Sequence, residues 1–135
     1  MPYSYIHRLL SRQIQESPKS ILLLGPRQTG KSTLIKTLKP DLTINLADEG
    51  EFLLFTRNPD ELKQRLASTS LKTVFIDEVQ RLPGLLNTVQ SILDDRNNMI
   101  KFYLTGSSAR KLKRGKANLL PGRVFQAVLF LFWDH

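Results

Sequence analysis

The segment from Gly25 to Thr33 reads Gly-Pro-Arg-Gln-Thr-Gly-Lys-Ser-Thr and matches the pattern G-x-x-x-x-G-K-[ST] at every fixed position. Glycines let backbone N–H groups curve around phosphates, and the helix that follows directs its positive end at them. We expect Lys31 to neutralise the β- and γ-phosphates of a nucleotide, Ser32 to ligate Mg²⁺, and Thr33 to contact the α-phosphate. The residues assigned to this nucleotide-binding loop are Gly25, Pro26, Arg27, Gln28, Thr29, Gly30, Lys31, Ser32 and Thr33.

Two adjacent carboxylates, Asp77 and Glu78, follow the apolar run Val74 to Ile76. Because side chains alternate along a strand, neighbouring carboxylates at its end can face different partners. We expect Asp77 to join the Mg²⁺ shell through water, and Glu78 to act as the general base that deprotonates an attacking water. A strand that simply ends in solvated acids is the alternative, and the glycine loop earlier in the chain favours the functional interpretation.

A polar tip, Thr105-Gly-Ser-Ser108, follows another apolar run. In an open parallel sheet the ligand lies outside the carboxyl ends of the strands, so this tip should lie beside the loop and the carboxylates. Thr105 or Ser107 is expected to sense the γ-phosphate or hold the attacking water, and the sequence does not choose between them. Gln80 is a further candidate for a hydrogen bond near that water.

A basic segment runs from Arg110 to Arg123 without an acidic residue. It could line an anion site, contact nucleic acid or present an arginine to the nucleotide of a neighbouring subunit, and a solvated helical face is the alternative. Arg123 precedes a predicted strand near the active edge of the sheet. Exposed aromatic residues are not expected between these basic residues, as a stacking platform for nucleic acid would need.

The chain has 135 residues, 41% of them hydrophobic and 24% charged, which indicates a single domain over 1–135. The formal net charge of +8 favours anionic partners. The sequence contains no cysteine and no run long enough for a membrane span, so we expect a cytoplasmic location without membrane contact. The two histidines lack metal-ligand spacing, and no metal other than Mg²⁺ is expected.

Alternating apolar runs and helical periodicities predict an α/β fold, a three-layer sandwich with a parallel sheet of about five strands. An acidic turn is expected at Asp48, Glu49 and Glu51. Strands are predicted over 20–24, 42–46, 72–76, 100–104 and 124–132, and helices over 6–15, 31–38, 60–67 and 85–93.

Together these motifs resemble the AAA-type P-loop ATPases of prokaryotes, specifically the AAA_14 group that is usually coupled to a DUF4143 domain. The matching stretches are Gly25 to Ser32, Phe75-Ile-Asp-Glu-Val-Gln80, Thr105 to Ser108, and Pro121-Gly-Arg-Val124. The resemblance implies a RecA-like core, ATP as the nucleotide, Asp77 and Glu78 as the Walker B pair, a sensor region at Thr105 to Ser107, and Arg123 as a trans-acting or sensor arginine. Members of the group are about three times longer, so we expect the lid and the C-terminal domain to be absent from these residues.

The leading hypothesis is an ATPase core that binds Mg²⁺-ATP and hydrolyses it. Two alternatives stay open: a truncated nucleotide-binding remnant without turnover, and a basic module that binds nucleic acid. A homo-oligomer and nucleic acid through residues 110–123 are the macromolecular partners that the sequence leaves open. The guanine-reading motif Asn-Lys-x-Asp of GTPases does not occur in the sequence, which favours ATP.

Overall fold

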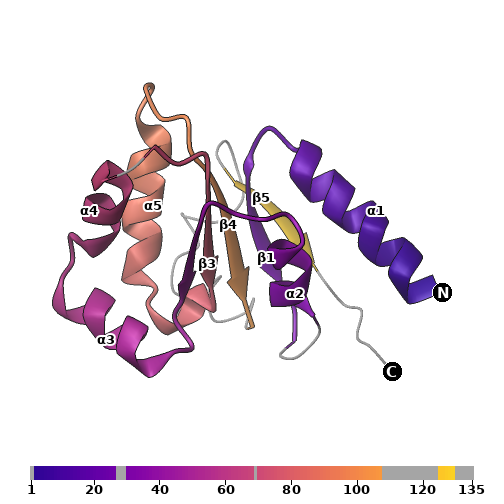
Figure 1. Cartoon of the computed structure of the whole chain (residues 1–135), viewed down its shortest axis with the longest axis horizontal. Helices are drawn as coiled ribbons and strands as arrows, with labels where there is room; N and C mark the ends of the chain where they lie inside the picture. Colours follow the sequence, from indigo (N-terminus) through magenta and orange to yellow (C-terminus); the bar gives the residue numbers. More distant parts are fainter. Residues whose placement is uncertain (1, 27–29, 69, 108–124, 130–135) are drawn as a thin grey trace.

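The computed structural model describes residues 2–26, 30–68, 70–107 and 125–129, and within them a parallel five-stranded sheet forms the centre of the molecule (Figure 1). The order of the strands is β2-β3-β4-β1-β5. The predicted α/β fold with a parallel sheet of five strands is therefore confirmed. The strands are β1 (Ser20–Leu24), β2 (Leu42–Asn45), β3 (Thr73–Asp77), β4 (Lys101–Gly106) and β5 (Phe125–Leu129).

The order of the strands decides which residues meet at the carboxyl edge of the sheet. Strand β4 lies between β1 and β3, so the strand before the glycine loop does not pair with the strand that ends in the two carboxylates. The register pairs Leu24 with Gly106 and Ile76 with Leu104. Thr105 is therefore the residue of β4 that comes beside Asp77, one position further along both strands.

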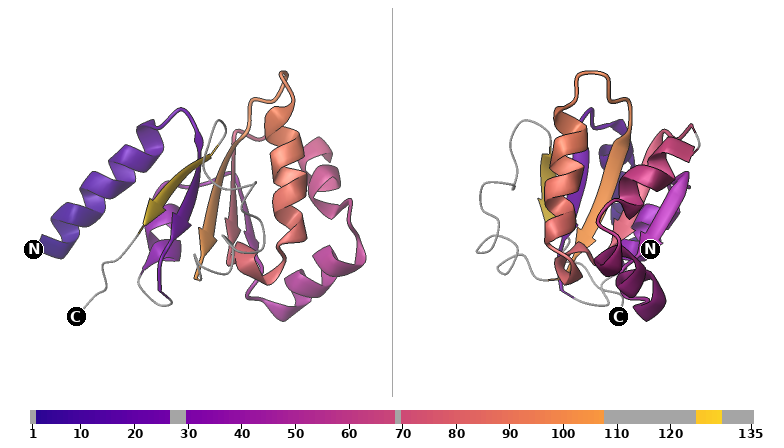
Figure 2. Two further views of the ribbon diagram at one scale, coloured as in Figure 1. Left: turned by 180° about the vertical axis from the view of Figure 1, so that it is seen from behind. Right: turned by 90° about the vertical axis from the view of Figure 1, so that its left-hand side faces the viewer.

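Helices cover both faces of the sheet and complete three layers (Figures 1 and 2). One face carries α1 (Pro2–Glu16) and α2 (Lys31–Lys36). The other face carries α3 (Glu49–Arg57), α4 (Glu61–Ser68) and α5 (Gly84–Asp94). The short 3₁₀ helix η1 (Val79–Arg81) follows β3 directly. Across the described residues, no helix combines the length and the apolar character that crossing a membrane requires.

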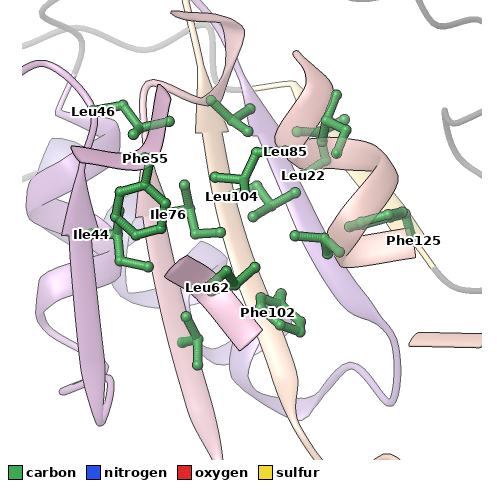
Figure 3. Close-up of a cluster of buried hydrophobic side chains, with 14 of the residues drawn as sticks. Leu22, Ile44, Leu46, Phe55, Leu62, Ile76, Leu85, Phe102, Leu104 and Phe125 are labelled. Atoms are coloured by element: carbon green, nitrogen blue, oxygen red, sulfur yellow. The ribbon is translucent and has the colours of Figure 1, made fainter. Parts of the chain in front are cut away.

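Alternate side chains of the strands supply two separate cores, because both faces of a parallel sheet are buried. The larger core lies under α3, α4 and α5, as Figure 3 shows. It includes Leu22, Ile76 and Leu104 from three neighbouring strands together with Phe55 and Leu85 from the helices. The smaller core joins α1 and α2 to the opposite face through Ile14, Ile21, Leu23, Leu34, Ile35, Phe75 and Tyr103.

The expected acidic turn after β2 is wrong, because these acids begin helix α3. The side chain of Asp48 accepts a hydrogen bond of 2.9 Å from the backbone N–H of Glu51 and forms the N-cap of the helix. Glu49 and Glu51 lie in the first turn, where negative charge is favourable beside the positive end of the helix. The acidic residues that suggested a turn therefore mark the N-terminus of a helix.

Candidate nucleotide-binding site

The glycine loop connects β1 to α2 at the carboxyl edge of the sheet. Gly30 has a φ of 91°, a left-handed conformation that glycine adopts without a steric penalty, and α2 starts at the next residue. The N–H of Gly25 donates to the carbonyl oxygen of Gly106 at 3.2 Å, which fixes the start of the loop to the end of β4. Arg27, Gln28 and Thr29 lie outside the described residues.

Lys31 is buried in this loop, with 4% of its surface exposed. Its Nζ donates hydrogen bonds to the carbonyl oxygens of Gly25 at 3.0 Å and Pro26 at 2.6 Å. Burial lowers the pKa of the Lys31 ammonium, and the nearby charges of Glu78 and Asp77 oppose this shift. The ammonium thus lies beside the backbone of the loop and near two carboxylates, Asp77 at the end of β3 and Glu78 directly after it.

Ser32 and Thr105 both donate hydrogen bonds to the carboxylate of Asp77. The Oγ of Ser32 donates to Oδ2 at 2.7 Å, and the Oγ1 of Thr105 donates to Oδ1. Asp77 and Thr105 are buried, and the exposed fraction of Thr105 is 0%. Three elements, α2, β3 and β4, therefore meet at one carboxylate, and each oxygen of that carboxylate has a separate hydroxyl donor.

Glu78 has a strained backbone at the point where the chain leaves β3. Its φ of 61° and ψ of 50° place it in the left-handed region, which costs a residue other than glycine about 1–2 kcal/mol. The N–H of Glu78 donates to the Oγ1 of Thr105 at 2.9 Å. This backbone turn separates the side chain of Glu78 from that of Asp77, and the two carboxylates have different partners.

The carboxylate of Glu78 accepts two hydrogen bonds on the same oxygen. The Oγ of Ser107 and the Nε2 of Gln80 each donate to Oε1 at 2.6 Å. The Oε1 of Gln80 in turn accepts from the N–H of Ser107 at 3.2 Å. These partners fix the orientation of the Gln80 amide, because its donor end meets a carboxylate and its acceptor end meets an N–H. We call Glu78, Gln80 and Ser107 the carboxylate clamp.

The structure separates the two residues that the sequence could not distinguish. Thr105 holds the backbone of Glu78 and the side chain of Asp77, whereas Ser107 holds the side chain of Glu78. Thr33 is exposed on α2. Arg123 and the rest of the basic segment 110–123 lie outside the described residues, so the structure does not place them.

Oxygen atoms dominate this site, and they are the donors that Mg²⁺ prefers. Ser32 and Asp77 offer a hydroxyl and a carboxylate at 2.7 Å from each other, a set that suits a cation bound by few protein ligands together with phosphate and water. Among the residues that the structure describes, no group of three or more histidine, cysteine, aspartate and glutamate side chains could hold a metal ion.

Solved structures of three other proteins resemble the chain in fold at low sequence identity. The P-loop NTPase domain of the sigma-54 transport activator from E. coli aligns with a TM-score of 0.56 and 13% identity, over 96% of this chain and 95% of that one. A structure of Pif1 helicases at forked double-stranded DNA aligns with a TM-score of 0.57 and 15% identity, over 95% and 43%. C. elegans PCH-2 gives a TM-score of 0.51 and 19% identity, over 97% and 41%.

Two mycobacterial proteins are similar in sequence. The uncharacterized proteins Rv2008c of Mycobacterium tuberculosis and Mb2031c of Mycobacterium bovis are each 30% identical to the chain over 118 residues. These matches cover 85% of the chain and 25% of each relative, so the chain spans about a quarter of their length. The sequence profile of the AAA domain family AAA_14 matches residues 17–133, which include the glycine loop and both carboxylates. The chain belongs to this AAA domain family.

Proposed function

We propose that this chain binds Mg²⁺-ATP at the glycine loop and hydrolyses the bond to the γ-phosphate. The observation that carries the proposal is the pair of hydrogen bonds by which Ser32 and Thr105 hold Asp77. Residues from three elements form one polar centre, and Lys31 lies close enough for its pKa to respond to both carboxylates. The match to the AAA domain family and the similarity in fold to a solved P-loop NTPase domain support the same proposal.

Lys31 supplies the positive charge for the phosphates. Its ammonium donates to the carbonyl oxygens of Gly25 and Pro26, which keeps the positive charge beside the backbone at the start of the loop. A buried cation is worth more to an anion than an exposed one, because water screens the attraction less. We assign the β- and γ-phosphates to this lysine, and the α-phosphate to Thr33.

Ser32 and Asp77 are the residues that would hold Mg²⁺, Ser32 directly and Asp77 through water. When bound, Mg²⁺ would neutralise charge that develops on the phosphate oxygens. Asp77 is held in place by Thr105, so its carboxylate needs little reorganisation when it takes part in binding.

Glu78 is the proposed general base. Ser107 and Gln80 hold Oε1, and among the described residues no hydrogen bond involves Oε2. Oε2 is therefore the oxygen that we assign to the attacking water, which it orients and from which it takes a proton. Arg123, as a sensor or trans-acting arginine in a homo-oligomer, stays a prediction that depends on residues outside the described ranges.

The test combines calorimetry of ATP binding in Mg²⁺ with phosphate release from the same purified protein, and uses Glu78→Gln as the matched variant. We expect Glu78→Gln to bind ATP as the unaltered chain does and to release phosphate about 10²-fold more slowly, the scale of general-base catalysis. The same two measurements with GTP in place of ATP test whether the site prefers adenine. Equal release by both proteins would remove Glu78 from its role, and binding without any release would leave a nucleotide-holding domain.

A further inference from the structure

The two outer layers of the molecule carry opposite charge. Helix α1 contains Arg8, Arg12 and a single acid, Glu16, and α2 contains basic residues and no acid. The layer on the opposite face is rich in acids at its helix starts and ends. These acids are Asp48, Glu49, Glu51, Asp60, Glu61, Asp94 and Asp95. The same layer also carries the bases Arg57, Lys63, Arg65, Arg81 and Arg96, so its net charge is only weakly negative, whereas the net charge of α1 and α2 is positive.

Helix α1 buries one side and leaves a mixed basic and apolar side in solvent. Leu10 and Ile14 pack toward α2 in the smaller core. Arg8 and Arg12 lie about half a turn of the helix away from these two residues, and both are exposed. Figures 1 and 2 show α1 running obliquely outward from the sheet, so that its N-terminal end projects from the body of the molecule.

An aromatic residue lies on the same outward side as the arginines. Tyr5 is 58% exposed and Leu9 is 49% exposed, so both side chains are open to a ligand from solvent. The spacing of Tyr5, Arg8 and Arg12 at i, i+3 and i+7 places them on one stripe of the helix. We call Tyr5, Arg8, Leu9 and Arg12 the outer stripe of α1.

We propose that the outer stripe of α1 binds the sugar-phosphate backbone of a nucleic acid strand, with Tyr5 against a base. Arginines at i and i+4 have Cβ atoms about 6 Å apart. The phosphates of one strand repeat every 3.4 Å or so along the axis of a duplex, so the two guanidinium groups reach different phosphates. No ion pair joins Arg8 or Arg12 to another described residue, and both guanidinium groups lie open to an anion.

Lys36 and Lys39 extend the same basic face beyond α1. Both are exposed, Lys36 at the end of α2 and Lys39 after it. Leu34 and Ile35 of α2, and Leu38 after it, share the smaller core with α1. An anionic membrane is the less favoured partner, because a helix that lies in a membrane surface needs a broad apolar side. The broad apolar side of α1 is already buried in the smaller core, and the outer stripe adds only Tyr5 and Leu9.

The site is separate from the carboxylate clamp and the glycine loop, so the two functions can be tested independently. The probe is a fluorescein-labelled 30-nucleotide oligo-dT strand, followed by fluorescence anisotropy at several salt concentrations, with a duplex of mixed sequence in parallel. The double variant Arg8→Ala/Arg12→Ala is compared with Arg57→Ala/Lys63→Ala, which removes the same charge from exposed positions on the acidic layer.

We expect Arg8→Ala/Arg12→Ala to weaken binding of the strand at least tenfold and to reduce the slope of log affinity against log salt by about 0.7 for each lost phosphate contact. Arg57→Ala/Lys63→Ala should change the affinity by less than threefold. Tyr5→Ala should weaken binding of oligo-dT more than binding of the duplex, because only unpaired bases stack freely on a side chain. Calorimetry should show unchanged ATP binding in all of these variants.

Three results would overturn the proposal. The first is an unaltered chain that binds neither probe at 50 mM salt. The second is an equal loss of affinity in the two double variants, which would indicate attraction by net charge alone. The third is retention on vesicles of phosphatidylserine and phosphatidylcholine without retention of either nucleic acid, which would assign the outer stripe to a lipid surface.

Discussion

Ser32 and Asp77, which are 45 positions apart in the chain, are joined by a hydrogen bond of 2.7 Å from Oγ to Oδ2. The contact connects the first turn of α2 to the last residue of β3, although β4 separates β1 from β3 in the sheet. Thr105, from the intervening strand, donates to the other oxygen of the same carboxylate. The proposed Mg²⁺ site therefore depends on the order of the strands.

Ser32→Ala should abolish the part of ATP affinity that depends on Mg²⁺. The variant loses the hydroxyl that would ligate the ion, and we expect its affinity in Mg²⁺ to fall about tenfold, close to the value in EDTA. Ser32→Thr keeps the hydroxyl and serves as the control. The measurement is calorimetry with and without EDTA. A Ser32→Ala protein whose affinity still rises with Mg²⁺ as in the unaltered chain would contradict the assignment.

Lys31→Ala should remove most of the affinity for ATP, by a factor of at least ten, or about 1.4 kcal/mol. The phosphates lose their buried cation, and the carbonyl oxygens of Gly25 and Pro26 lose a donor. Lys36→Ala is the matched control, because Lys36 lies on the same helix with its side chain exposed. Nucleotide titrations of the two variants give the comparison, and equal affinities would rule out a phosphate site at Lys31.

Gln80→Ala should slow phosphate release about tenfold while it leaves the Kd for ATP unchanged. The variant removes one of two donors that hold Oε1 of Glu78, so the base is less well positioned although the nucleotide loop is intact. Gln80→Glu should slow release further, because it places a second carboxylate beside the first. Gln90→Ala, on α5, is the control. If Gln80→Ala instead changed the Kd and kcat by the same factor, Gln80 would act on binding rather than on the base.

Much of the sheet could be predicted from apolar runs. Ser20–Leu24 was predicted to the residue, because the strand is buried on both faces and is apolar after its first residue. β3 and β4 continue further than predicted, to Asp77 and Gly106. Polar residues end an apolar run in the sequence, but Asp77 still pairs with Asn45 of β2. Thr105 and Gly106 likewise pair with Leu23 and Leu24 of β1, so both strands extend past their apolar runs.

The sequence could not predict which carboxylate Thr105 and Ser107 would each bind. Each is a hydroxyl near the end of β4, and only the register with β3 decides which one reaches Asp77 and which one reaches Glu78. Register is a property of pairing between strands that are distant in sequence. The outer stripe of α1 was missed for a related reason, since the periodicity of the helix shows an apolar side but not which residues other elements cover.

Asp41→Asn should make the free energy of unfolding less sensitive to acid. The Oδ2 of Asp41 accepts from the N–H groups of Lys72 at 2.8 Å and Thr73 at 3.0 Å, which ties the turn before β2 to the start of β3. The hydrogen bond from Lys72, followed by that from Thr73, lowers the pKa of Asp41 below its usual 3.8.

The lowered pKa of Asp41 determines how the free energy of unfolding changes with pH. The unfolded chain binds the proton more readily than the folded chain does, so the carboxylate stabilises the fold above a pH of about 3.8 and loses this contribution as the pH falls through the lower folded pKa. The neutral amide of Asp41→Asn has no such dependence. Urea unfolding between pH 6 and pH 2.5 should therefore show the two proteins converging in stability toward the acid end. Curves that stay parallel over this range would mean that the bonds from Lys72 and Thr73 do not favour the charged form of Asp41.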